Sequence, residues 1–331
     1  MSARDTDWDG VRLHVVTGKG GTGKTTVAAA LALALASGGR RVLLVETEGR
    51  QGIAQLFDTP PLPYEERKVA VAPGGGDVYA LAIDTEEALL EYLEMFYNLK
   101  RAGKALTKLG IIDFVTTIAP GLRDVILTGK ASEAVRRRRK NGTFIYDAVV
   151  MDAPPTGRIT KFLNVNTEVA GLAKVGPIRN HADTVMRVIR SPETAVHFVT
   201  LLEEMPVQET LDGIHDLHAA EIPVGGVIVN MEQPAVLPSK ELEAAGQGRL
   251  DLDEIIRGLK AAGLEHDAEP IAQVLAGEAA DRAARRALQR REKERLDEVD
   301  QPRYSLPMLP DGMDLACLYD LAESLREQGA A

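Results

Sequence analysis

The sequence predicts an α/β fold with a doubly wound, mostly parallel sheet. Short apolar runs of strand length recur along the chain, and their hydrophobic residues are nearly continuous rather than alternating. Strands buried on both faces have this pattern, which is typical of parallel sheets covered by helices. Helical patterns separate the runs, as in doubly wound folds. The expected strands are residues 13–17, 41–46, 78–83, 146–151, 195–200 and 224–230, with a weaker one at 305–309.

The composition argues against several classes of protein. Of the 331 residues, 45% are hydrophobic, which is enough for a substantial core. The net charge of −10 disfavours general nucleic-acid binding, which needs a basic face. A single cysteine, Cys317, allows no disulfide framework within the chain and suits a cytoplasmic protein. The polar, acidic N-terminus and the short apolar stretch 27–36 lead us to expect no signal peptide and no membrane span.

Two intervals between expected strands are too long for simple crossovers. Residues 85–140 and 164–192 are expected to form an inserted helical subdomain, and residues 1–84, 141–163 and 193–331 a discontinuous core. Apolar residues in the first interval follow helical spacing. They are Leu89, Leu93, Phe96, Leu99, Leu106, Leu109, Ile112, Val115, Ile118 and Leu122. The dense apolar span within 106–122 has two possible uses: it lines a groove for a hydrophobic partner segment, or it packs the subdomain onto the core or a partner subunit. The residues of this span are Leu106, Leu109, Ile111, Ile112, Phe114, Val115, Ile118 and Leu122.

Other segments have simpler interpretations. Residues 71–77 contain three consecutive glycines and are expected to form a turn. The basic run 136–140 is interpreted as a solvated helix end. Residues 231–302 form a polar excursion that ends in a highly charged helix, expected at 278–297.

A glycine-rich segment follows the first expected strand and precedes an Ala/Leu-rich helical pattern. It consists of Gly18, Lys19, Gly20, Gly21, Thr22, Gly23, Lys24, Thr25 and Thr26, and it fits GxxxxGK(S/T). This strand–loop–helix context is the one a P-loop requires. Glycines let backbone N–H groups face phosphates, and the helix N-terminus adds positive potential. We therefore expect ATP and Mg²⁺ to bind here, with Lys24 on the β- and γ-phosphates and Thr25 on the metal.

An acidic residue ends another expected strand. Asp152 directly follows residues 146–151. A carboxylate at the C-terminal end of a strand is well placed to hold Mg²⁺ or its bound water. Residues 153–157 contain prolines and a glycine and are expected to form a loop that senses the γ-phosphate. A plain strand-end turn is the alternative.

These motifs resemble those of known ATPases. The segment GKGGTGKTT resembles the deviant P-loop of the MinD/ParA/nitrogenase-iron-protein class, and the resemblance implies that Lys19 reaches across a dimer to the partner's nucleotide. Residues 152–163, DAPPTGRITKFL, resemble the DTAPTGHTLRFL motif of a narrower family. That family contains the arsenical pump-driving ATPases and the ATPase for guided entry of tail-anchored proteins.

The resemblance extends more weakly along the chain. Residues 119–121, 204–210, 226–230 and 306–309 are similar to other segments of that family. It implies that Asn230 contacts adenine and that Pro307 and Met308 line the base. For Asn230, a strand-end cap or turn remains an equal alternative.

Two departures from the family pattern affect the expected chemistry. The family segment STDPAH, whose Asp positions the attacking water, is replaced by ETEGRQ at residues 46–51, so Glu48 stands in for that Asp. Glutamate can also hold a water, although its longer side chain changes the geometry. The arsenite-binding cysteines and the zinc-binding cysteine pair of the family have no counterpart.

The resemblance implies a Mg²⁺-dependent ATPase of the arsenical-pump and tail-anchored-protein-targeting family. It would act as an ATP-driven switch, as a homodimer or a heterodimer with a related ATPase subunit, that handles a hydrophobic client or membrane-protein segment. Catalytic roles are expected for Lys19, Lys24, Glu48 and Asp152. One alternative is a non-hydrolysing nucleotide-binding subunit. Another is a MinD/ParA-like positioning ATPase, whose membrane helix would usually be basic, whereas residues 314–328 are acidic.

Overall fold

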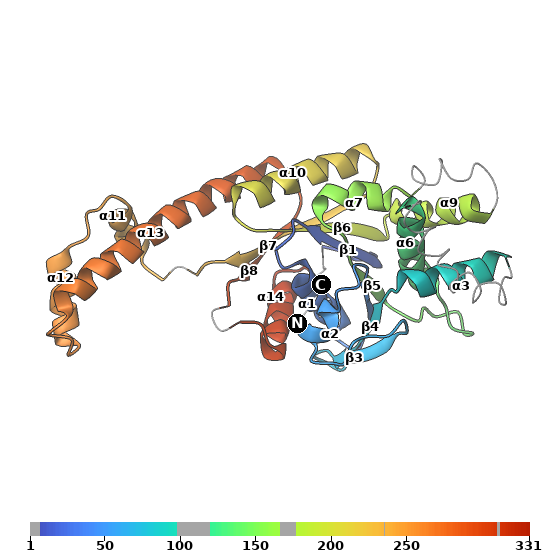
Figure 1. The fold of residues 1–331 in the computed structure, drawn as a ribbon, viewed down its shortest axis with the longest axis horizontal. Coiled ribbons are helices and arrows are strands. Elements are labelled where there is room, and N and C mark those ends of the chain that lie inside the picture. The colour runs from blue at the N-terminus through green and yellow to red at the C-terminus, as the bar shows by residue number, and fades with distance from the viewer. Residues whose placement is uncertain (1–6, 98–119, 166–176, 235, 310–311) are drawn as a thin grey trace.

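The computed structural model describes residues 7–97, 120–165, 177–234, 236–309 and 312–331. Eight strands form one sheet in the order β3-β4-β2-β5-β1-β6-β7-β8 (Figure 1). All neighbouring strands are parallel except β3 and β4. The strands are β1 Leu13–Gly18, β2 Arg41–Glu46, β3 Arg67–Val71, β4 Asp77–Ala82, β5 Ala148–Asp152, β6 Thr194–Thr200, β7 Val224–Glu232 and β8 Arg303–Pro307. The predicted α/β fold with a mostly parallel sheet is confirmed.

Helices cover both faces of the sheet. One face carries α6 (Pro120–Arg136), α7 (Thr156–Leu163), α9 (Pro177–Ile189) and α10 (Glu204–Ala219); the other carries α1 (Lys24–Ala36), α2 (Gly52–Leu56) and α14 (Leu315–Glu327) (Figure 1). Alternate residues of one strand enter opposite cores: Leu43 faces the first, and Val42 and Leu44 face the second. The central strands are largely apolar because both of their faces are buried.

The edge strand β3 was missed by the sequence pattern. It pairs antiparallel with β4 through the turn at residues 72–76, where the Ala72 N–H donates to the Gly76 carbonyl at 2.7 Å. Its Arg67 and Lys68 are exposed, so it lacks the continuous apolar run that marks the buried strands. The predicted turn around 71–77 is confirmed.

The helices of the expected insert belong to the layer on one face of the sheet, where α6 packs on β5 and β1. Helix α3 (Thr85–Tyr97) packs on α6, and α6 packs on α9. Leu89 is buried, and Leu122 packs partly buried against the core. Leu99, Leu106, Leu109, Ile112, Val115 and Ile118 lie outside the described residues. The division into core and inserted subdomain therefore stays a prediction.

The excursion after β7 forms a helical arm that extends away from the sheet (Figure 1). We use "arm" for α11 (Ser239–Gly246), α12 (Leu252–Ala261), α13 (Ala268–Arg295) and the short helix η1 (Leu296–Glu298). The charged helix expected at 278–297 begins earlier, at Ala268, because alanine-rich residues before 278 also favour helix. Lys293 pairs with Glu232 at 3.0 Å, so the arm is attached at the end of β7.

The last helix belongs to the core. Leu318, Leu321 and Leu325 of α14 are buried, and the helix packs along α1. None of the helices in the described ranges is long and apolar enough to cross a membrane.

Candidate nucleotide site

The P-loop connects β1 to α1, as the motif requires. Gly21 and Gly23 adopt positive φ angles of 90° and 84°, which glycine accepts most readily. A Cβ at Gly23 would lie 2.4 Å from Asn230 Nδ2, so no larger residue fits there without rearrangement. The Thr22 hydroxyl donates to the Lys19 carbonyl at 2.9 Å and stabilises the turn of the loop.

The two residues expected to hold Mg²⁺ are in direct contact. Thr25 begins the first turn of α1, and its hydroxyl donates to Asp152 Oδ2 at 2.7 Å. Both line a cavity of about 210 Å³ together with Lys24 and Glu48. The structure thus brings together residues that are 127 positions apart in the chain.

Asp152 lies in an unusual electrostatic environment. It is 7% exposed, and this burial raises the pKa of its carboxyl group to about 6. The Thr25 hydrogen bond and the Lys24 charge lower the pKa, whereas the carboxylates of Glu46 and Glu48 raise it further. The three carboxylates of the site therefore outnumber its two basic side chains, Lys24 and Arg50, and it would accommodate a cation.

The sheet register brings a second carboxylate to this edge. Strands β2 and β5 are parallel neighbours, and Glu46 stands directly opposite Asp152. Glu46 is 2% exposed and lines the same cavity. No role for Glu46 was expected from the sequence, although it ends a buried strand just as Asp152 does. That shared position was the signal that could have identified it.

Glu48, expected to replace the family's catalytic Asp, is more exposed. Its side chain is 25% exposed, and its Oε2 lies 3.8 Å from Arg50 Nε. Both side chains line the cavity. Glu48 is therefore near enough to solvent and to the P-loop to contact a water beside bound phosphates.

Lys19 forms an ion pair within the chain. Its Nζ contacts Glu209 Oε1 on α10, and both side chains are about one-third exposed. The residue expected to act across a dimer is thus held by a carboxylate 190 positions away. The role of Lys19 in a dimer stays a prediction.

The residues expected near the base lie beyond the P-loop. Asn230 is buried at the end of β7, where its amide donates to the Thr22 carbonyl at 2.8 Å. Pro307 ends β8, and the Met308 N–H donates to the Glu232 carbonyl at 2.9 Å. Met308 is exposed and lines a cavity of about 510 Å³ with residues of α13. Contact of these residues with adenine stays a prediction.

The loop after Asp152 is fixed to neighbouring strands. Thr47 Oγ1 donates to the Asp152 carbonyl and Thr17 Oγ1 to the Pro154 carbonyl, each at 2.7 Å. Helix α7 begins immediately afterwards, at Thr156. A shift of Asp152 would therefore be transmitted to α7 through a short and well-anchored connection.

The residues present fit a hydrated metal ion bound with nucleotide phosphates. In the described part of the chain, no group of three or more His, Cys, Asp or Glu side chains could hold a metal by itself. Mg²⁺ usually takes one or two carboxylates, with waters and phosphate oxygens completing its coordination. Thr25 and Asp152 would hold it, and its charge would offset that of the phosphates.

Together, the parallel sheet, the P-loop and the adjoining acidic strand end define a P-loop nucleotide-binding protein. The family model for anion-transporting ATPases matches residues 11–191, more than half of the chain, and the chain therefore belongs to this family of ATPases. The family resemblance predicted from the motifs is confirmed.

Named proteins that the chain resembles are also described as ATPases. The chain is 55% identical to ATPase BagA of Mycobacterium tuberculosis over 320 residues, which cover 97% of this chain and 94% of that protein. It is 26% identical to an arsenical pump-driving ATPase of Acidiphilium multivorum, over 69% of this chain and 40% of that protein. It is also 23% identical to ATPase get3 of Schizosaccharomyces japonicus, over 65% and 72% of the two chains.

Proposed function

We propose that the chain is a cytoplasmic, Mg²⁺-dependent ATPase that works as a dimeric switch for a hydrophobic client or partner protein. The contact between Thr25 and Asp152 is the observation that supports this proposal most, since a P-loop hydroxyl and a strand-end carboxylate lie together as a Mg²⁺ site would require. Asp152 also leads directly into α7, so one residue connects the metal site to the helices above the sheet. Switches of this class change conformation when γ-phosphate contacts are made and lost.

Helix α7 supports a route from the metal site to the inserted helices. It packs on both α6 and α10. Arg158, on its first turn, lies 3.7 Å from the nearly buried carboxylate of Asp124 on α6. A movement of α7 would therefore be transmitted to α6 and to α10. Helix α10 carries Glu209, which pairs with Lys19.

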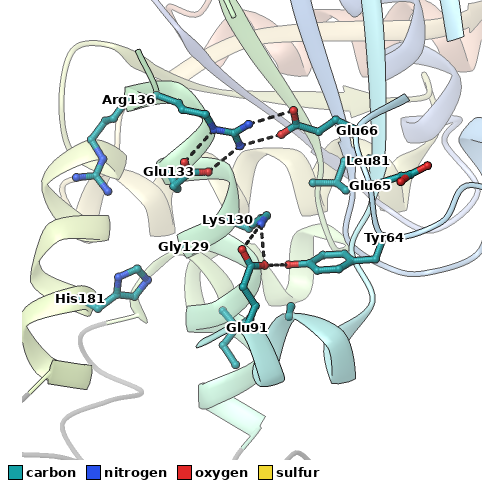
Figure 2. A pocket seen from close by; sticks show the side chains of 13 residues that line it. Tyr64, Glu65, Glu66, Leu81, Glu91, Gly129, Lys130, Glu133, Arg136 and His181 are labelled. Atoms are coloured by element: carbon teal, nitrogen blue, oxygen red, sulfur yellow. Dashed lines mark hydrogen bonds and ion pairs between the residues drawn. The ribbon is translucent and has the colours of Figure 1, made fainter. Parts of the chain in front are cut away.

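A polar network joins the inserted helices to the core (Figure 2). Glu91 on α3 accepts hydrogen bonds from Tyr64 at 2.6 Å and from Lys130 on α6 at 2.8 Å. Arg137, just after α6, donates to Glu66 at 3.0 Å and to Glu133 at 2.7 Å. These residues surround a cavity of about 650 Å³ between residues 64–66, which precede β3, and helices α3, α6 and α9. Rearrangement of this network would allow the helices to move relative to the sheet.

The client of such a switch would contact the inserted subdomain. The apolar residues of 106–122 suit an amphipathic or hydrophobic helix laid in a groove. Packing onto the core or a partner subunit is the alternative use of these residues. A MinD/ParA-like role is disfavoured by α14, whose apolar side is already buried against α1.

Turnover and oligomeric state test the proposal together. The purified chain should release phosphate from ATP with Mg²⁺ and not with EDTA. Light scattering should detect a dimer with a non-hydrolysable ATP analogue and a smaller species with ADP. Tight ATP binding without turnover would instead favour the non-hydrolysing subunit. Unchanged hydrogen exchange over 106–122 in both nucleotide states, with no crosslink to a hydrophobic helical peptide, would exclude the client groove.

A further inference from the structure

Glu46 is a buried acid in the nucleotide cavity for which the function above needs no role. It ends β2, is 2% exposed and faces the same cavity as Lys24, Thr25 and Asp152. Its Oε1 accepts a hydrogen bond from the Gly52 N–H at 3.3 Å. Among the residues that the structure describes, its Oε2 finds no hydrogen-bond donor.

Such an oxygen calls for a further hydrogen-bond donor. Leaving a buried polar atom unpaired costs on the order of 1–3 kcal/mol, and more when the group is charged. The preceding residues of β2 bury apolar side chains, so a buried glutamate at this position departs from the pattern of the strand. A bound group that donates to Oε2 would account for the residue.

The position of Glu46 indicates what that group is. Glu46 stands opposite Asp152 in the sheet register, one strand away from the presumed metal ligand. On its other side, Gly52 lies against Thr25, since a Cβ at Gly52 would be 3.2 Å from Thr25 Cγ2. Glu46 therefore lies close to both residues that would hold Mg²⁺, and all three line the same cavity.

We propose that Glu46 is a positioning residue of the metal site, whose Oε2 accepts a hydrogen bond from a water bound to Mg²⁺. This inference rests on the proposed Mg²⁺-ATP function. A water-mediated role suits Mg²⁺, which keeps several of its waters in protein sites. Partners of this kind orient the direct ligands of a metal and tune its affinity.

Calorimetric titration with ATP tests the inference when it is done twice, once with Mg²⁺ and once with EDTA. Glu46→Gln keeps the side-chain shape and an acceptor for Gly52, and it removes the charge. We expect it to reduce the gain in ATP affinity on adding Mg²⁺ by about tenfold or more. Affinity for metal-free ATP should stay equal or increase, since a negative charge near the phosphates is lost. Mn²⁺ binding followed by electron paramagnetic resonance should weaken in parallel.

Glu48→Gln is the matched control, since it removes the same charge from a more exposed position in the same cavity. It should lower turnover and keep the Mg²⁺-dependent gain in affinity. Glu46→Asp, which retains a carboxylate, should restore part of that gain. Thermal unfolding of each variant verifies that it is folded.

The outcomes separate the two proposals. A Glu46→Gln protein that is folded and keeps the full Mg²⁺-dependent gain overturns the inference, even if its turnover is low, because Glu46 would then act on the attacking water. If the parent protein shows no Mg²⁺-dependent ATP binding at all, the proposed function itself fails.

Discussion

Two buried histidines in the central strands should make the fold sensitive to mild acid. His14 on β1 and His197 on β6 are almost fully buried, and His14 Nδ1 lies 3.0 Å from His197 Nε2. The Gly226 N–H donates to His197 Nδ1, so His197 Nε2 carries the proton and donates to His14. A second proton on either ring would place two donors face to face. Burial lowers the pKa of His14 to about 4 and that of His197 well below its usual value.

The sign and size of the effect follow from linkage. Histidine in the unfolded chain takes up a proton near pH 6.5, whereas His14 in the folded protein does so near pH 4. Stability is therefore fully present above pH 6.5 and is lost as pH falls through this window. His14 alone contributes a loss of about 1.5 kcal/mol between pH 6.5 and 5, and about 3 kcal/mol below both pKa values. His197 adds to this loss.

The assay is urea unfolding at several pH values in that window. The variant His14→Asn removes one titrating ring and keeps an oxygen that can accept from His197. Its free energy of unfolding is lower at neutral pH, but it should fall less steeply between pH 6.5 and 5 than that of the parent. Asp152, whose raised pKa of about 6 stabilises the fold at low pH, opposes the effect equally in both proteins. His266→Gln, at an exposed position, is the control. Equal slopes for parent and His14→Asn would refute the reasoning.

The remaining predictions concern the nucleotide site. Lys24→Ala should weaken Mg²⁺-ATP binding by about tenfold or more, because a charged hydrogen-bond partner is worth roughly 1.5–3 kcal/mol; calorimetric affinity within about threefold of the parent would contradict the assignment. Lys19→Ala should spare nucleotide binding and reduce ATP-dependent dimerisation and turnover, and mixing it with a second inactive variant should restore activity if mixed dimers form and the lysine acts across them. Glu209→Gln should release Lys19 and increase dimerisation by light scattering, whereas unchanged dimerisation would make the ion pair merely structural. Glu48→Gln should lower turnover by about 100-fold with ATP affinity retained; equal turnover would place the base elsewhere.

The buried part of the fold could be predicted from the sequence, because each central strand coincides with a nearly continuous apolar run. Strand β3 could not, since an edge strand needs one buried face only and can carry Arg67 and Lys68. Helix α13 begins earlier than expected, because the expectation followed its charged residues, and Gly277 and the alanines before it carry no charge.

The site was predicted only where a motif is local. The P-loop and Asp152 each have a short pattern, so the residues expected to bind phosphate and metal could be named from the sequence, and the structure brings Thr25 and Asp152 into contact. The neighbours of these residues depend on strand order: Glu46 meets Asp152 only because β2 lies beside β5. The pairing of Lys19 with Glu209 likewise requires knowing that α10 follows β6 next to β1. No local pattern records such contacts.

The length of the arm makes it useful for measuring small motions at the nucleotide site. Helix α13 has 28 residues, which makes it about 42 Å long. It is attached where β7 ends, and β7 also carries Asn230 against the P-loop. A rotation of about 10° at the attachment would displace the far end by roughly 7 Å, many times more than any shift at the P-loop itself. A spin label near the far end of α13 would therefore report nucleotide-dependent motions that are too small to resolve by a label at the P-loop.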